Sequence, residues 1–104
     1  MLNVDDALNY MGIDYADEMV RANADRSLAA AHMHMLGAIG ADVEKYLPED
    51  PRIDELVLIY TDDLYSERGL NAKVSGAVRR QVANIELQLR LELKRAKEAA
   101  GDIV

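Results

Sequence analysis

The chain has 104 residues, a mass of 11.6 kDa and a net charge of −7, which allows one domain with a single modest core. It has no cysteine, which excludes disulfides and thiolate metal sites, and it lacks the apolar runs of a signal peptide or a membrane span, so we expect a soluble intracellular protein. Residues 1–72 hold 15 acidic and 5 basic residues, whereas residues 73–104 hold 4 acidic and 7 basic ones, so only the last third can attract nucleic acid or an acidic partner.

The first two predicted elements are a short helix and a long helix. Asn3 is an N-cap candidate for the short helix, and Gly12 ends it. The long helix runs from about Ala16, with apolar residues on roughly one face, and ends near Gly37 and Gly40. Small residues along the long helix allow a second helix to approach closely: Ala24, Ser27, Ala30, Ala31 and Ala38.

Two prolines in the sequence YLPEDPR interrupt the chain before a third helix. Asp50 and Pro51 form a favourable N-cap and first-turn pair for that helix, and Gly69 ends it. Ser75 is the N-cap candidate of a fourth helix. The apolar spacing of three or four residues in these two helices predicts the following core residues: Leu56, Tyr60, Leu64, Val82, Ile85 and Leu89.

The stretch NIELQLRLEL, residues 84–93, carries two conflicting signals. Its alternating apolar residues are typical of a strand, but the residues between them favour a helix. A strand here would have no partner for its backbone groups, so we predict a helix. At about 100° per residue, Leu89 and Leu93 then share one side, whereas Leu87 and Leu91 lie near the opposite side. We expect this two-faced helix to pack on its own core with one side and on another subunit with the other.

These elements predict an all-α fold, a small bundle of about four helices in the order short, long, medium, long. The aromatic residues are five tyrosines, so the core must be built from Leu, Ile, Val, Met and Ala, which favours helices over a sandwich. We expect one domain covering residues 1–104, with residues from about 94 to 104 as a less ordered tail.

Two short motifs contain residue types found in metal sites, but their predicted geometry does not suit a metal ion. YTDD, residues 60–63, matches the carboxylate pair of template-copying polymerases, but it falls inside a predicted helix of a chain too short for such an enzyme. His32 and His34 are two positions apart on a helix, so their rings cannot share one ion without distortion. No phosphate-binding glycine loop and no Ser, His and acid set at a recognisable spacing is present. We therefore expect no enzyme activity, no catalytic residues, no metal and no cofactor.

Four segments of the chain carry a resemblance through their order and spacing. They are LNVDDALNYMGID, an alanine-rich helix ending at Gly40, DELVLIYTDDLYSERG and VSGAVRRQVANIELQLRLEL, which together span about residues 2–93. The chain resembles the head-tail connector (adaptor) family of tailed phages, including its branch with a QLR-G motif. LYSERG looks like the family's Leu-Tyr-x-x-Arg signature at the end of the third helix, and QLR is present at residues 88–90. The chain departs from the family at Leu91, where a glycine often follows QLR.

The resemblance implies a structural virion protein. Such proteins form a homo-oligomeric ring, usually twelve-fold, that docks beneath the portal protein of a DNA-filled capsid. The ring prolongs the channel for passing double-stranded DNA without sequence specificity, and it is the platform for a stopper or tail protein. The implied location is the host cytoplasm during assembly and then the virion neck, with no membrane contact. Together with the second apolar face, the family motifs predict these subunit or portal contacts: Tyr65, Arg68, Leu87, Gln88, Arg90, Leu91 and Lys94.

Other interpretations stay open at this point. Tyr65 and Arg68 can instead serve core packing and a salt bridge at a helix end. The chain can also be a small phage or prophage regulatory protein that binds a host regulator or nuclease as a defined dimer. A third class is a DNA-binding protein that uses the basic fourth helix and has steeply salt-dependent affinity. Glu86 and Glu92, which lie among the basic residues of that helix, argue against DNA binding.

Overall fold

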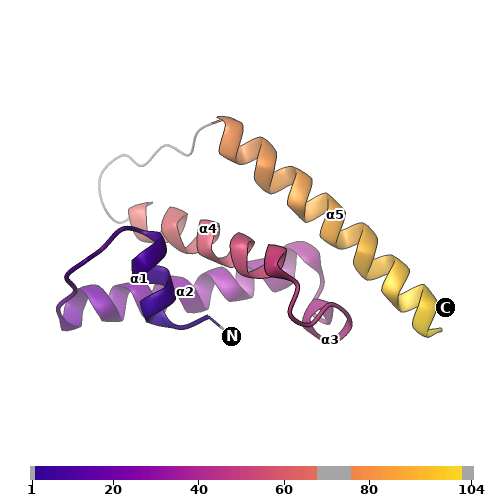
Figure 1. The fold of residues 1–104 in the computed structure, drawn as a ribbon, viewed down its shortest axis with the longest axis horizontal. Helices are drawn as coiled ribbons and strands as arrows, with labels where there is room; N and C mark the ends of the chain where they lie inside the picture. The colour runs from indigo at the N-terminus through magenta and orange to yellow at the C-terminus, as the bar shows by residue number, and fades with distance from the viewer. Residues whose placement is uncertain (1, 68–75, 102–104) are drawn as a thin grey trace.

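A computed structural model describes residues 2–67 and 76–101 of the chain. Within these ranges it contains helices and no strand, and the helices form a small bundle (Figure 1). Their bounds are α1 Val4–Tyr10, α2 Glu18–Ile39, α3 Val43–Tyr46, α4 Pro51–Glu67 and α5 Gly76–Ala100. The prediction of an all-α fold is confirmed, and the contested stretch at residues 84–93 is helical.

Side-chain caps fix where the helices begin. Asn3 accepts a hydrogen bond from the backbone of Asp6, whose carboxylate accepts one from the backbone of Asn3, so the first helix starts with a complete capping box. Asp17 caps α2 through the Val20 backbone N–H at 2.8 Å, which places the start of that helix slightly after the expected Ala16. Asp50 accepts from the Arg52 backbone N–H at 3.0 Å, as its position before Pro51 predicts.

Two parts of the chain differ from the expected helix pattern. The turn after Gly40 contains α3, a four-residue helix that is too short for any apolar periodicity to reveal, and its Val43 is fully buried. At the other end, α5 continues to Ala100 through residues that we expected to be less ordered. The predicted helix end at Gly69, the predicted cap at Ser75 and the last residues, 102–104, lie outside the described residues.

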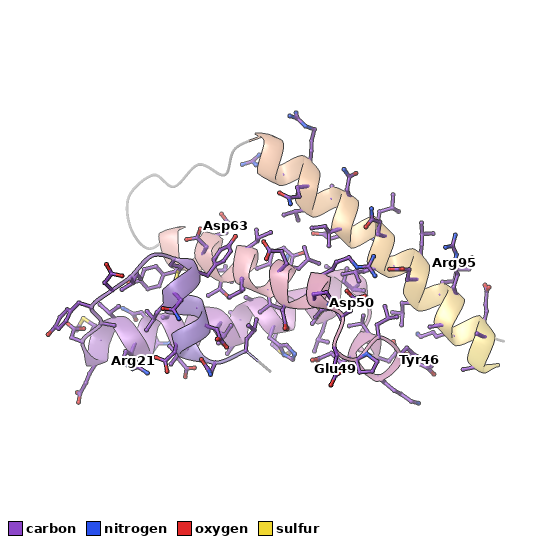
Figure 2. All side chains as sticks on the ribbon, in the orientation of Figure 1. Arg21, Tyr46, Glu49, Asp50, Asp63 and Arg95 are labelled. Carbon is purple, nitrogen blue, oxygen red and sulfur yellow. The ribbon has the colours of Figure 1, made fainter. Side chains whose placement is uncertain are left out.

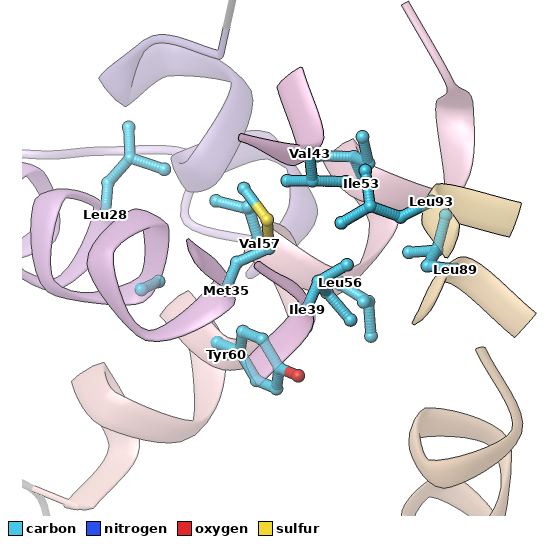
Figure 3. Packing of buried hydrophobic residues seen from close by; sticks show 11 residues of the cluster. Leu28, Met35, Ile39, Val43, Ile53, Leu56, Val57, Tyr60, Leu89 and Leu93 are labelled. Atoms are coloured by element: carbon cyan, nitrogen blue, oxygen red, sulfur yellow. The ribbon is translucent and has the colours of Figure 1, made fainter. Parts of the chain in front are cut away.

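The core lies mainly between α2 and α4, and α3 and α5 add side chains around this pair (Figure 3). Two residues of α1, Ala7 and Leu8, are also buried. Of the predicted core residues, Leu56, Tyr60 and Leu89 are buried. The remaining three are partly buried and pack against the same cluster: Leu64, Val82 and Ile85. Alanines of α2, including the fully buried Ala24 and Ala31, allow the close packing that their small size predicts.

The molecule is more extended than a compact domain of its length. Its Cα radius of gyration is 15.0 Å, whereas about 13 Å is typical for some 100 residues. The difference reflects α5, which meets the other helices near its C-terminal half and diverges from α4 toward its N-terminal end (Figure 1). No helix in the described part of the chain is long and apolar enough to cross a membrane.

Candidate subunit interface

The inner side of α5 is anchored in the core by two leucines. Leu89 is fully buried and Leu93 is 4% exposed, and both belong to the main hydrophobic cluster. Leu93 approaches the chain closely at Gly40, where a β-carbon would lie 2.7 Å from its Cδ2 atom. Gly40 has a φ of +152°, a backbone conformation that favours glycine. The end of α2 and the packing of α5 through Leu93 therefore depend on the same residue.

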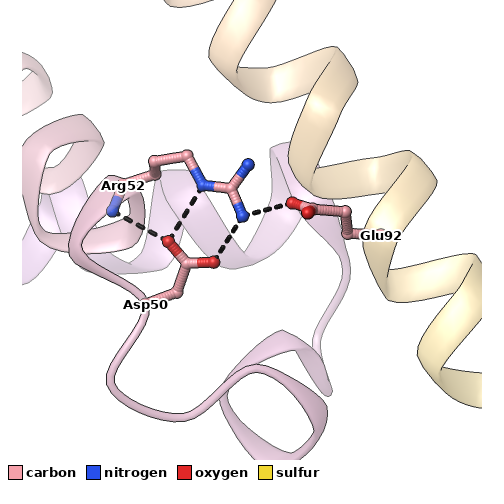
Figure 4. Close-up of polar contacts among 3 residues, drawn as sticks. All are labelled: Asp50, Arg52 and Glu92. Atoms are coloured by element: carbon pink, nitrogen blue, oxygen red, sulfur yellow. Dashed lines mark hydrogen bonds and ion pairs between the residues drawn. The ribbon is translucent and has the colours of Figure 1, made fainter.

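A polar cluster joins the start of α4 to α5 (Figure 4). The Arg52 guanidinium donates to both carboxylate oxygens of Asp50, with Nε–Oδ1 at 3.0 Å and Nη2–Oδ2 at 2.6 Å. The same Nη2 forms an ion pair with Glu92 of α5. The hydrogen bond from Arg52 lowers the pKa of Asp50, and the bonds to its two carboxylate partners raise the pKa of Arg52. This cluster fixes the rotation of α5 about its axis, because Glu92 must face α4.

Three further contacts hold the same side of α5. Lys97 Nζ lies 2.7 Å from Asp42 Oδ2, and its hydrogen bond lowers the pKa of Asp42. Arg90 Nη1 donates to the Ala38 carbonyl near the end of α2 at 3.0 Å. The Tyr60 hydroxyl donates to Glu86 at 2.5 Å, and burial together with this carboxylate raises the pKa of Tyr60.

The opposite side of α5 carries an apolar surface with basic surroundings. Leu87 is 52% exposed and Leu91 is 47% exposed, whereas the neighbouring positions Leu89 and Leu93 are buried. The two-faced character predicted for this helix is therefore present. We call the exposed side the outer stripe, and Figure 2 shows the side chain of Arg95 on this side pointing away from the bundle. Its residues are Arg80, Asn84, Leu87, Leu91, Lys94, Arg95 and Glu98, and all of them are exposed.

The other predicted contact residues lie in environments that differ from one another. Gln88 and Lys94 are exposed on α5, as a contact surface requires. Arg90 is exposed too, but its guanidinium is engaged with Ala38 of its own subunit. Tyr65 is partly buried on α4, and Arg68 lies outside the described residues.

The two histidines and the threonine of the YTDD motif have partners within the subunit. His32 Nε2 lies 2.8 Å from Glu44 Oε1, whereas the ring of His34 packs edge-on against Tyr60 at 4.7 Å, so the two rings have different partners. In YTDD, the Thr61 hydroxyl donates to the Val57 carbonyl one turn earlier. Among the described residues, no group of three histidine or carboxylate side chains is arranged to hold an ion.

Metal addition provides a direct check on this point. Because His32 and His34 point to different partners, the two rings offer zinc or nickel no shared site. We expect the melting temperature to stay unchanged across a titration with either ion. A saturable rise of several degrees would restore the metal hypothesis, because a ligand that binds only the folded state raises its stability.

One feature of the surface is not visible in the sequence pattern. A pocket of about 360 Å³ lies between α2 and α4, with Leu2 and α3 at its edge. Its apolar lining includes Leu28, Met33 and Val57. Its polar lining includes three carboxylates and one imidazole: Asp25, Glu44, Asp54 and His32. We call it the acidic pocket. Helical spacing places Leu28 and Val57 in the core, but only the tertiary structure brings the three carboxylates around them.

Comparison of the chain with models of protein families, with curated proteins and with solved structures gives no match in any of the three.

Proposed function

We propose that this protein is a structural subunit that assembles with copies of itself through the outer stripe of α5. The observation that carries the proposal is the exposure of Leu87 and Leu91, at 52% and 47%, on a helix whose other side is fixed to the core. Burying a leucine side chain contributes about 1.5–3 kcal/mol, so two leucines in each contact are a substantial term when the contact repeats in an assembly. Scattered apolar residues are ordinary on protein surfaces, but here two lie one turn apart on the same stripe.

The assembly we propose is the ring of a phage head-tail connector. Two motifs of the chain that resemble those of the connector family support this assignment. LYSERG begins within the last residues of α4, and QLR lies on α5 immediately before Leu91. In the family that the chain resembles, the ring is usually twelve-fold. In this role the ring docks beneath a portal protein, extends the DNA channel and accepts a stopper or tail protein after packaging. The protein acts in the host cytoplasm during assembly and then in the virion neck.

The charge distribution suits a conduit for DNA. The part of the chain before residue 73 has an excess of ten negative charges, so most of the subunit repels a phosphate backbone. A channel that attracts the duplex only weakly lets it slide, because tight binding needs many phosphate contacts by lysine and arginine. The proposed function includes no catalysis, and this function requires neither a metal nor a cofactor.

The proposal is tested with portal-bearing, DNA-filled heads from the phage that encodes this chain. Purified protein is mixed with these heads, unbound protein is removed by sedimentation, and the bound amount is measured against concentration. We expect saturable binding at one subunit for each portal subunit, and heads that then accept tails. Heads that bind no protein, or that complete normally without it, would contradict the proposal.

DNA binding is the second candidate, and one observation favours it. Arg80, Lys94 and Arg95 are exposed on one side of α5 and form no ion pair with any residue that the structure describes. A DNA-binding protein would lose affinity for duplex DNA steeply as salt rises, in proportion to its phosphate contacts. For a connector, we expect duplex binding to remain weak even at low salt.

A further inference from the structure

We infer that the acidic pocket of one subunit receives the outer stripe of a second copy of the chain. This inference rests on the proposed function, because it names the surface that the stripe contacts in the assembly. The two surfaces belong to different parts of the molecule, the stripe to α5 and the pocket to α2 and α4. Each subunit would then donate one helix and accept another.

The pocket has the size and lining that two leucine side chains require. At about 360 Å³ it lies near the lower end of the roughly 300–1,000 Å³ of ligand pockets, which suits a few side chains rather than an entire helix. Its floor is apolar, because Leu28 and Val57 are 8% and 3% exposed. Met33 stands at its edge with 68% of its surface exposed, and methionine adapts its shape to an incoming apolar group.

The charges around the two surfaces are complementary. Asp25, Glu44 and Asp54 contribute three carboxylates to the pocket, and the His32 ring, which also lines it, pairs with Glu44. The outer stripe carries three cations and one carboxylate beside its leucines: Arg80, Lys94, Arg95 and Glu98. Opposite charges that flank an apolar contact steer the encounter and fix its register.

The positions of the two surfaces allow a head-to-tail contact between copies. On α4, Asp54 lines the pocket, whereas Arg52, two residues earlier, pairs with Glu92 of α5. Two residues in a helix are separated by about 200°, so the pocket and α5 lie on different sides of α4. When the stripe of one copy enters the pocket of a second copy, whose own stripe enters a third, the contact is head-to-tail, and it closes into a ring when the rotation between subunits allows it.

A contact between two outer stripes is the competing arrangement. It would place three cations of one copy opposite the same three of another, with Glu98 as the only carboxylate that the stripe supplies. Like charges across an interface disfavour it, and the contact would join two subunits and stop. The charges therefore favour the pocket as the occupied surface.

The contact between stripe and pocket can be tested with two variants, each of which alters one of the two surfaces. Leu91→Asp damages the stripe and leaves the pocket intact, whereas Met33→Asp damages the pocket and leaves the stripe intact. Both positions are exposed, at 47% and 68%, so neither change buries a charge in the core. At concentrations where the wild-type chain forms oligomers, we expect each variant alone to sediment as an 11.6 kDa monomer and an equal mixture to form a dimer that grows no further. Met19→Asp is the matched control, because Met19 is 74% exposed on the same helix and does not line the pocket, and this variant should assemble as wild type does.

Cross-linking provides a second measurement that also captures weak association. The natural chain has no cysteine, so Leu91→Cys and Met33→Cys each introduce one thiol. With a short bismaleimide, a mixture of the two should yield the mixed dimer several-fold more than either variant alone yields its homodimer. Homodimers of Leu91→Cys in excess would overturn the inference in favour of contact between stripes. Absence of the mixed dimer would overturn it as well. If heads still bind the protein in that case, the proposed function stands and only the pocket assignment fails.

Discussion

Replacing Leu89 with aspartate is expected to unfold the protein, whereas the same change at Leu91 should leave it folded. Leu89 is fully buried in the cluster that joins α5 to the core, so an aspartate there places an unpaired carboxylate among apolar side chains. Such a burial costs several kcal/mol, against a total stability of about 5–15 kcal/mol for a typical domain. Leu91 is 47% exposed, so an aspartate at that position meets water in the free subunit.

Far-UV circular dichroism and thermal unfolding of the two variants measure this difference. We expect Leu89→Asp to lose its cooperative transition or to shift it to a far lower temperature. Leu91→Asp should keep the helical spectrum and a melting temperature close to that of the wild type. If both variants unfold alike, α5 has no free side, and the outer stripe cannot be a surface for another subunit.

Replacing Gly40 with alanine is the second change with a large expected effect. Its φ of +152° is strained for any residue with a β-carbon, which costs on the order of 1–3 kcal/mol. The new β-carbon would also lie 2.7 Å from Leu93 Cδ2, so Leu93 must move from its seat in the core. For a domain of this size, each kcal/mol lowers the melting temperature by roughly 4–8 °C, so we expect a fall of several degrees or more.

Gly37→Ala is the matched control for Gly40→Ala. Gly37 lies within α2, and a β-carbon there meets no atom within 4 Å. Alanine favours the helix over glycine by about 0.5–1 kcal/mol, so this variant should melt slightly above the wild type. Opposite shifts in the melting temperatures of the two variants would support the close packing of Leu93 of α5 against Gly40. A Gly40→Ala variant as stable as the wild type would show that the end of α2 and Leu93 are arranged differently.

The sequence predicted the parts of the fold that depend on neighbours along the chain. Asn3 and Asp50 act as helix caps, because capping requires only a side chain and a backbone group a few residues apart. The opposite exposures of Leu89 and Leu91 follow from helical geometry in the same way. A helix at residues 84–93 was predicted because a single strand has no partner, and the structure confirms it.

The parts that sequence reasoning missed depend on contacts between distant residues. Arg90 donates to a carbonyl 52 positions earlier in the chain, and no local spacing indicates that its guanidinium engages its own subunit. The Arg52 to Glu92 ion pair and the acidic pocket arise in the same way, from packing between helices. The short helix α3 contains only four residues, which is too few for a periodic signal.

The mass of the assembly formed on a portal protein shows whether the outer stripe of α5 joins subunits, as we propose. Wild type and Leu91→Asp are each mixed with the portal protein of the phage to which the proposed function assigns the chain, and the complexes are measured by native mass spectrometry. We expect wild type to add a complete ring of 11.6 kDa subunits to the portal, whereas folded Leu91→Asp should add none or only isolated subunits. A complete ring of Leu91→Asp, or a portal that binds no wild-type protein, would overturn the proposed role of the outer stripe.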